Sequence, residues 1–180
     1  MKRSTPGLDP KDILRHAMAF QHSARRLAEK RPGDDDIWPL FAHPYMVLVA
    51  LSAELYLKCT HCIDSTETPW GHPLDILYAD LPALRRNRIA FHWEKLNSQP
   101  ELVRRRAQLA AQGMHIPDDL PTVLRDCGNA FEVVRYIYEH PNGTKFYGID
   151  TLPEAVRQTI IEIHPDLAAL SFPGIKKLGP

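Results

Sequence analysis

A nearly unbroken apolar stretch, YMVLVALSAELYLKC, constrains the fold of this chain most strongly. Its apolar residues cover most sides of a helix, which is typical of a central helix in a bundle rather than of a surface helix. Within it, Val47, Leu51, Glu54 and Lys58 share one stripe at three- and four-residue spacing. Burying an unpaired charge costs several kcal/mol. We therefore expect Glu54 and Lys58 to be buried and to have partners of opposite charge.

Length and composition favour a single soluble domain. The chain has 180 residues, and 22 basic residues balance 22 acidic ones, so no overall field directs it to nucleic acid or to a membrane. Three cysteines suit a reducing compartment better than a disulfide framework. The N-terminal segment lacks the apolar core of a signal peptide, and no uninterrupted apolar run is long enough to span a bilayer. We predict a cytoplasmic protein without a membrane contact, folded as one domain over residues 1–180.

The periodicity of the whole chain predicts helices and few strands. A helical pattern or helix boundary signals mark five segments, which are residues 11–30, 39–63, 100–113, 120–139 and 151–170. Residues 72–97 suggest a short helix that is broken near Pro82 and followed by a longer one. Between the segments 120–139 and 151–170, an Asn142-Gly143 turn signal leaves a small hairpin open as an alternative. The sequence predicts an all-α fold, a four- to five-helix up-and-down bundle with extra short helices and a core over about residues 10–140.

The predicted helix over residues 120–139 is also strongly apolar, and like the first one it has charged residues in its apolar stripe. Arg135 lies in the middle of its apolar stripe, with Glu139 one turn beyond. If the two helices pack together, Glu54 can face Arg135 and Lys58 can face Glu139. His72, at the start of the segment after the first helix, can reach the same cluster. Three interpretations stay open, which are a structural ion-pair network between core helices, a binding or catalytic cleft, and pairing within each helix at a semi-exposed edge.

Three motifs follow one another over roughly residues 45–139, namely SAELYLKC, a polar loop ending in GHPLDILYADLP, and a later NAFEVVRYIYE. In this order they resemble the HEPN-like helical domains of prokaryotes. It implies a bundle that is often dimeric and that belongs to defence, toxin–antitoxin or RNA-processing systems. Many members are metal-independent endoribonucleases, and others are binding or assembly modules. The resemblance therefore implies RNA, a second copy of the chain and a cognate antitoxin or system partner as candidate partners, and no cofactor.

The ribonuclease signature of that family is an arginine, usually followed by a polar residue, with a histidine after four to six intervening residues. The run RRNRIAFH matches it with Arg85 or Arg86 and His92. In such chemistry the arginine stabilises charge on the scissile phosphate, while the histidine transfers a proton during attack by the 2′-hydroxyl. On a straight helix Arg85 and Arg88 share the face of His92, whereas Arg86 lies about 120° away. The alternative is a surface pair without a catalytic role.

A local excess of basic residues surrounds this motif. Between Leu84 and Gln108 there are seven basic side chains and two acidic ones, and Phe91 and Trp93 are interleaved with them. Cationic and aromatic side chains together suit single-stranded RNA, because they neutralise phosphates and stack on bases. An ordinary solvated helix face has the same composition. The candidate RNA contacts beside the motif are Arg88, Lys95, Arg104, Arg105 and Arg106.

Cysteine and histidine patterns carry less information. The CTHC run places Cys59, His61 and Cys62 at metal-like spacing, but no second pair follows at the spacing of a zinc finger. Cys127 has no neighbouring base in the sequence that would activate it as a nucleophile. We predict no metal site, and buried free thiols at these positions.

The sequence leads to one functional hypothesis and one alternative. The hypothesis is an RNA-acting or RNA-binding HEPN-like protein, with His92 as general acid or base and Arg85 or Arg86 on the phosphate. The alternative is a non-catalytic HEPN-like protein that binds a small ligand or another protein, with the Glu54 cluster as a structural element or a pocket.

Overall fold

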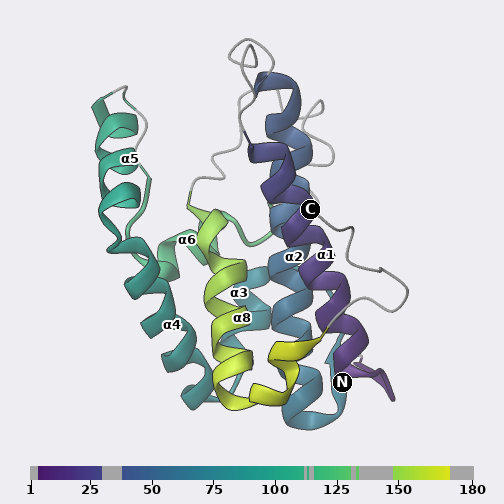
Figure 1. The fold of residues 1–180 in the computed structure, drawn as a ribbon. Coiled ribbons are helices and arrows are strands. Elements are labelled where there is room, and N and C mark those ends of the chain that lie inside the picture. The colour runs from purple at the N-terminus through teal and green to yellow at the C-terminus, as the bar shows by residue number, and fades with distance from the viewer. Residues whose placement is uncertain are drawn as a thin grey trace.

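The computed structural model describes residues 4–29, 38–111, 113, 116–130, 133 and 148–170. Within these residues nearly all of the regular structure is helical, which confirms the predicted all-α fold (Figure 1). The α-helices are α1 (Pro10–Ala28), α2 (Trp38–Ser65), α3 (Leu74–Ala79), α4 (Ala83–Asn97), α5 (Pro100–Ala111), α6 (Leu120–Asp126) and α8 (Leu152–Ile163). The short elements are the strands β1 (Ser4–Pro6) and β2 (Glu67–Pro69) and the 3-10 helices η2 (Ile149–Thr151) and η3 (Pro165–Ala169).

Helices α1 and α2 lie side by side and form the most extensive helix pair (Figure 1). Two buried hydrogen bonds fix their relative position. The Ser52 hydroxyl donates to the carbonyl of Ala17 at 2.9 Å, and the Tyr56 hydroxyl donates to Gln21 Oε1 at 2.7 Å. The stripe of α1 that is buried consists of Leu14, Ala17, Gln21 and Ala24. Its three- and four-residue spacing is the amphipathic pattern predicted for this segment.

Helix α2 is long and apolar enough over Phe41–Ser65 to cross a membrane, judged by length and composition alone. The segment is not an uninterrupted apolar run, because Glu54 and Lys58 lie within it. In the structure, 56% of the most apolar window of this helix is buried inside the protein. Its buried side chains include Ala50, Ala53 and Leu57. This packing favours the core helix of a soluble protein.

The N-terminal segment pairs with the chain that follows α2, a contact that the sequence did not predict. Strands β1 and β2 are antiparallel, and Thr5 lies opposite Thr68. Between α2 and β2 the chain reverses at Thr66, which has a φ of 57° and donates its N–H to the carbonyl of Cys62 at 2.9 Å. A β-branched residue is unfavourable in this left-handed region, so the turn is strained. The ladder holds the N-terminal segment beside β2, which also contacts α2.

The helix predicted over residues 120–139 is not continuous, so that prediction is wrong. Helix α6 ends at Asp126, and the chain turns through residues 127–129. The carbonyl of Gly128 accepts a hydrogen bond from the N–H of Leu74, at the first residue of α3, at 2.8 Å. A Cβ at Gly128 would lie 2.8 Å from a carboxylate oxygen of Asp75, so the close approach of α3 favours glycine there. Contact with α3 therefore overrides the local helical periodicity.

Helix α8 packs against α2 and α4 (Figure 1). The carboxylate of Glu154 joins it to α1. This carboxylate accepts hydrogen bonds from Gln21 at 3.1 Å, from Arg25 at 2.9 Å and from Arg157 at 2.6 and 3.0 Å. Burial by itself would raise the pKa of Glu154, but the hydrogen bonds from Arg157 and Gln158 outweigh burial and lower the pKa to about 2. Glu154 is therefore ionised in the folded protein at neutral pH.

Candidate ligand-binding site

A buried carboxylate on α2 organises the candidate site. The side chain of Glu54 is only 3% exposed. The Lys58 ammonium donates to Glu54 Oε1 at 2.8 Å, and His72 Nδ1 lies 2.9 and 3.0 Å from the two carboxylate oxygens. An ionised carboxylate only accepts hydrogen bonds, so Nδ1 of His72 carries the proton in this contact. The 3% exposure of Glu54 confirms its predicted burial, and the distances to Nδ1 confirm the predicted contact with His72.

Part of the predicted cluster cannot be placed. Arg135 and Glu139 lie outside the described residues. Within the described part of the chain, Glu54 is compensated by Lys58 from the same helix and by His72 from the loop before α3. The pairing of α2 with the second apolar helix therefore stays a prediction.

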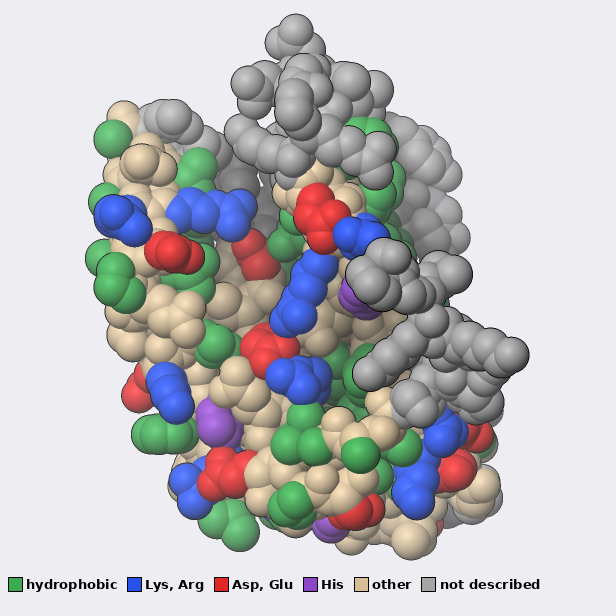
Figure 2. Space-filling view, in the orientation of Figure 1, with side chains coloured by type: hydrophobic (Ala, Val, Ile, Leu, Met, Phe, Trp, Pro, Cys, Tyr) green, Lys and Arg blue, Asp and Glu red, His purple; other side chains and the backbone are tan. Residues whose placement is uncertain are grey.

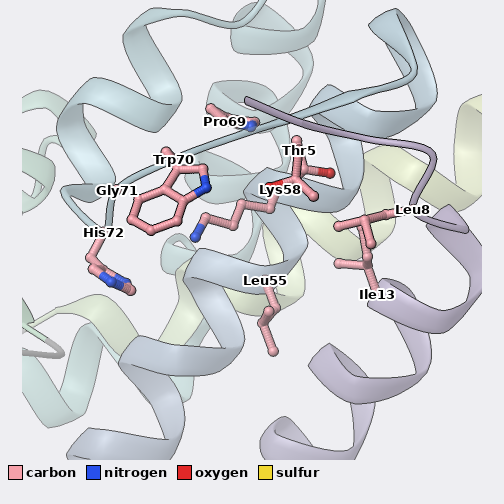
Figure 3. A pocket seen from close by; sticks show the side chains of 10 residues that line it. Thr5, Leu8, Ile13, Leu55, Lys58, Pro69, Trp70, Gly71 and His72 are labelled. Atoms are coloured by element: carbon pink, nitrogen blue, oxygen red, sulfur yellow. The ribbon is translucent and has the colours of Figure 1, made fainter. Parts of the chain in front are cut away.

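A cavity of about 350 Å³ lies beside Lys58 (Figure 3). Its walls come from three parts of the chain, namely β1 with the start of α1, the middle of α2, and β2 with the turn that follows it. Figure 3 shows the Lys58 ammonium pointing between the side chains of Trp70 and His72. The apolar residues of the lining are Leu8, Ile13, Leu55, Pro69 and Trp70.

Thr68 contributes a polar group that is buried and unsatisfied. The residue is 7% exposed, lines the cavity, and its hydroxyl has no hydrogen-bond partner among the described residues. Leaving a buried hydroxyl without a partner costs about 1–3 kcal/mol, and native proteins contain few such groups. A polar atom of a bound molecule would satisfy this hydroxyl.

The turn after β2 gives the cavity its rim. Gly71 has a φ of 109°, a conformation that side chains with a Cβ rarely adopt. This turn lets the chain leave β2 and present His72 to Glu54 on α2. Trp70, at the same turn, is 68% exposed, which is unusual for so large an apolar side chain. The rim therefore carries an aromatic surface next to the Lys58 ammonium.

His92, the predicted proton-transfer residue, lies between α4 and α8. Its Nε2 is 2.7 Å from Glu162 Oε2, and its Nδ1 is buried without a hydrogen-bond partner among the described residues. Arg88 Nη2 contacts the other oxygen of Glu162 at 3.1 Å. The accessible nitrogen of His92 is thus occupied by a carboxylate, and the other nitrogen faces the interior. A substrate would have to displace Glu162 before it could exchange a proton with this ring.

The structure does not bring Arg85 or Arg86 to His92. The Arg85 guanidinium forms a bidentate pair with Asp64, at 2.6 Å from Nη2 and 2.9 Å from Nε, which joins α4 to the end of α2. Arg86 donates to the carbonyl of Ala79 at 2.6 Å and so satisfies the end of α3. Of the arginines in the motif, only Arg88 shares a partner with His92 among the described residues. The helical phase explains this result for Arg86, and the tertiary contact with Asp64 explains it for Arg85.

The other predicted RNA contacts are divided between structural and exposed roles. Arg106 donates to the backbone and side chain of Asn97 at 2.7 and 2.9 Å, and Arg105 lies 3.6 Å from Asp150. Lys95 and Arg104 are exposed. Helix α5 has no buried residue and extends away from α1 and α2 (Figure 1). On the face in Figure 2, basic side chains over α4 and α5 alternate with acidic ones rather than forming a continuous patch.

The residues of the CTHC run do not converge. Cys59 and Cys62 each donate through sulfur, at 3.3 Å, to the carbonyls of Pro10 and Leu8, whereas His61 Nε2 lies 2.8 Å from the carbonyl of Leu77. Among the described residues no group of three or more metal-ligating side chains comes together. Burial raises the pKa of the Cys59 and Cys127 thiols to about 12, so both are protonated and weakly nucleophilic at neutral pH.

Several residues that build these sites escaped the sequence interpretation. Thr68 and Trp70 lie in a segment that reads only as a polar loop, although a tryptophan followed by glycine in such a loop is a weak signal of a functional rim. Asp64 and Glu162 become important through contacts with α4, and no local spacing relates them to that helix. Comparison with family models, with curated proteins and with solved structures found no match.

Proposed function

We propose that this protein is a non-catalytic binding module that holds a small molecule in the cavity between α1, α2 and β2. The observation that carries the proposal is a cavity whose wall includes Lys58 and Thr68, a residue whose buried hydroxyl has no hydrogen-bond partner among the described residues. Ligand pockets are typically apolar clefts with a few polar groups that fix the orientation of the ligand. Their volumes range upwards from about 300 Å³. This cavity, at about 350 Å³, suits a small ligand.

The chemistry of the lining supports binding rather than catalysis. Lys58 and His72 both contact the Glu54 carboxylate, which holds them as oriented donors. The described lining has no carboxylate, cysteine or serine, and the two lining groups that could act as a base, Lys58 and His72, are each paired with Glu54. The proposal agrees with the binding branch of the HEPN-like resemblance, and with it we keep a cytoplasmic location and a homodimer as proposals.

The test uses amide NMR spectra of the full chain with a small set of aromatic and aliphatic probe molecules. We expect shifts confined to residues around the cavity, because binding at such a site changes little else. Leu55→Trp should fill the cavity and abolish them, whereas Val103→Trp, on the exposed face of α5, should leave them unchanged. Shifts that persist in Leu55→Trp, or a complete absence of shifts in the natural protein, would contradict the proposal.

A second candidate function is single-stranded RNA binding on the outer face of α4. Four exposed side chains follow one another at helical spacing there, and they are Leu84, Arg88, Phe91 and Lys95. Leu84 is 67% and Phe91 is 52% exposed. An exposed aromatic ring between two cations supports base stacking combined with phosphate contact. The exposed Arg104 on α5 would extend this surface.

RNA binding is tested by its salt dependence. We expect binding of a single-stranded RNA to weaken as salt rises, and the triple change of Arg88, Lys95 and Arg104 to Gln to reduce the log–log slope by about 2. The same change of Lys11, Arg25 and Arg26 on α1 provides the matched control. Binding that is independent of salt, or an equal loss in both variants, would contradict an RNA surface on α4.

Cleavage is a separate outcome of the same experiment. Because Glu162 occupies His92 Nε2, we expect the RNA to remain intact in EDTA. If RNA but not DNA is cut, and His92→Gln lowers the rate by about 10²–10⁴, His92 is a general acid or base and the ribonuclease hypothesis gains its support.

A further inference from the structure

We infer that the ligand of the cavity is a small aromatic carboxylate, whose anionic group meets Lys58 and Thr68 and whose ring lies against Trp70. This inference rests on the proposed function, and it names the chemical class of the ligand.

The sign of the ligand charge follows from the lining. Of the described lining residues, Lys58 carries a permanent positive charge, and none is acidic. Glu54 is not part of the wall and is 3% exposed, so a ligand does not meet its charge directly. An ammonium has three donors, and Glu54 Oε1 accepts one at 2.8 Å. The donors that remain suit an anion, and they would repel a cation.

Thr68 supplies the second, independent observation. Its hydroxyl can donate one hydrogen bond and accept others, and it has no partner among the described residues. Thr68 is on β2 and Lys58 is on α2, so the two polar residues line the cavity from different elements. A carboxylate has two oxygens and can accept from both groups at once, which a halide or another single-atom anion cannot do as well.

The apolar part of the ligand is set by the remaining walls. Leu55 and Ile13 line the cavity with apolar surface, and Trp70 presents a largely exposed indole at the rim (Figure 3). Aromatic pairs are worth about 0.5–1.5 kcal/mol beyond the burial of their area, equal to about 2- to 13-fold in affinity. A flat ring attached to the carboxylate can therefore stack on the large aromatic side chain that the fold leaves exposed at this site.

The experiment compares three probes of the same shape by calorimetry on the full chain: 1-naphthoate, 1-naphthalenemethanol and 1-naphthylmethylammonium. We expect the carboxylate to bind about 10-fold or more tightly than the alcohol, and the cation to bind most weakly. Octanoate, an aliphatic carboxylate, should bind more weakly than 1-naphthoate. Tighter binding of octanoate would overturn the aromatic part of the inference.

Two variants assign the contacts. Thr68→Val removes the unsatisfied hydroxyl with little change of shape, so the fold should persist while affinity for 1-naphthoate falls about 3- to 10-fold. Lys58→Met should lower it about 10- to 100-fold, and Lys95→Met, on α4, should leave it unchanged. Affinity for the alcohol should not depend on Lys58.

The outcomes separate the inference from the proposed function. If all three naphthalene probes bind equally and Leu55→Trp blocks them, the cavity is a small-molecule site but the anionic class is wrong. If no probe binds, both proposals fail. If 1-naphthoate binds equally well to the natural protein, Thr68→Val and Lys58→Met, the carboxylate contacts inferred here are wrong.

Discussion

Two clusters in this protein contain the same kinds of side chain but bury different members. Beside the cavity, Glu54 is 3% exposed, while His72 is 45% exposed. Between α4 and α8 the order is reversed, because His92 is 11% and Glu162 is 39% exposed. Each cluster also contains a cation that contacts the carboxylate. Lys58 lies on the helix of Glu54, whereas Arg88 lies on the helix of His92.

The difference teaches which member the fold depends on. A buried carboxylate needs its cationic partners, because water cannot solvate it if they are removed. An exposed carboxylate can return to water, so its ion pair contributes little to stability. The cluster at the cavity should therefore be sensitive to substitution, whereas the cluster at α4 should tolerate it.

The largest expected effect is that of Lys58→Met. Removing the ammonium leaves Glu54 with His72 as its only described partner, and we expect a loss of about 3 kcal/mol in the free energy of unfolding, measured by urea titration at pH 7. The double variant Glu54→Leu with Lys58→Met should be more stable than Lys58→Met alone, because it removes the uncompensated charge. An unchanged unfolding midpoint for Lys58→Met would remove the distinction between the two clusters.

A third carboxylate, Glu154, extends the comparison to a pH dependence. Its pKa is lowered to about 2 in the folded protein, against an ordinary value of 4.5, because hydrogen bonds from Arg157 and Gln158 outweigh the effect of burial. A depressed pKa means that the stabilisation is present above about pH 4.5 and is lost as the pH falls towards 2. Since Glu154 is only partly buried, we expect Glu154→Gln to cost about 2 kcal/mol at pH 7.

The measurement for Glu154 is a pair of urea titrations. The difference between the natural protein and Glu154→Gln should shrink from pH 7 to pH 3. A difference that stays constant over this range would show that Glu154 acts through packing and not through its charge.

A smaller effect tests the turn that joins α2 to the cavity. Thr66 has a φ of 57°, and asparagine adopts this conformation more readily than a β-branched residue. We expect Thr66→Asn to raise the free energy of unfolding by about 0.5–1 kcal/mol, measured by thermal and urea unfolding. A loss of stability would show that the Thr66 side chain contributes more than its strained backbone costs.

The smallest effect is expected at the other cluster. Arg88→Met removes a contact between two largely exposed side chains, so the free energy of unfolding should change by less than about 0.5 kcal/mol. Urea titration beside Lys58→Met provides the direct comparison. A loss as large as that of Lys58→Met would mean that Glu162 depends on Arg88 as Glu54 depends on Lys58.

The sequence by itself determined the local elements and the burial of a charge in the central apolar helix. Helical spacing placed α1, α2 and α5 within a few residues of their observed bounds, and Pro82 marked the break between α3 and α4. The stripe shared by Glu54 and Lys58 predicted burial, because the phase of a helix follows from its sequence. His72 was also placed correctly at Glu54, since a short loop carries the chain back over α2.

Only the tertiary structure decided what these elements enclose. The opposition of Thr5 and Thr68, the approach of α3 to Gly128 and the contact of Glu162 with His92 each join parts of the chain that local spacing does not relate. A three- or four-residue period fixes which side of one helix is buried, but it does not specify which distant side chain is packed against it. The cavity, with its unsatisfied hydroxyl, exists because three separate segments meet there, and this meeting is a property of packing and not of any one segment.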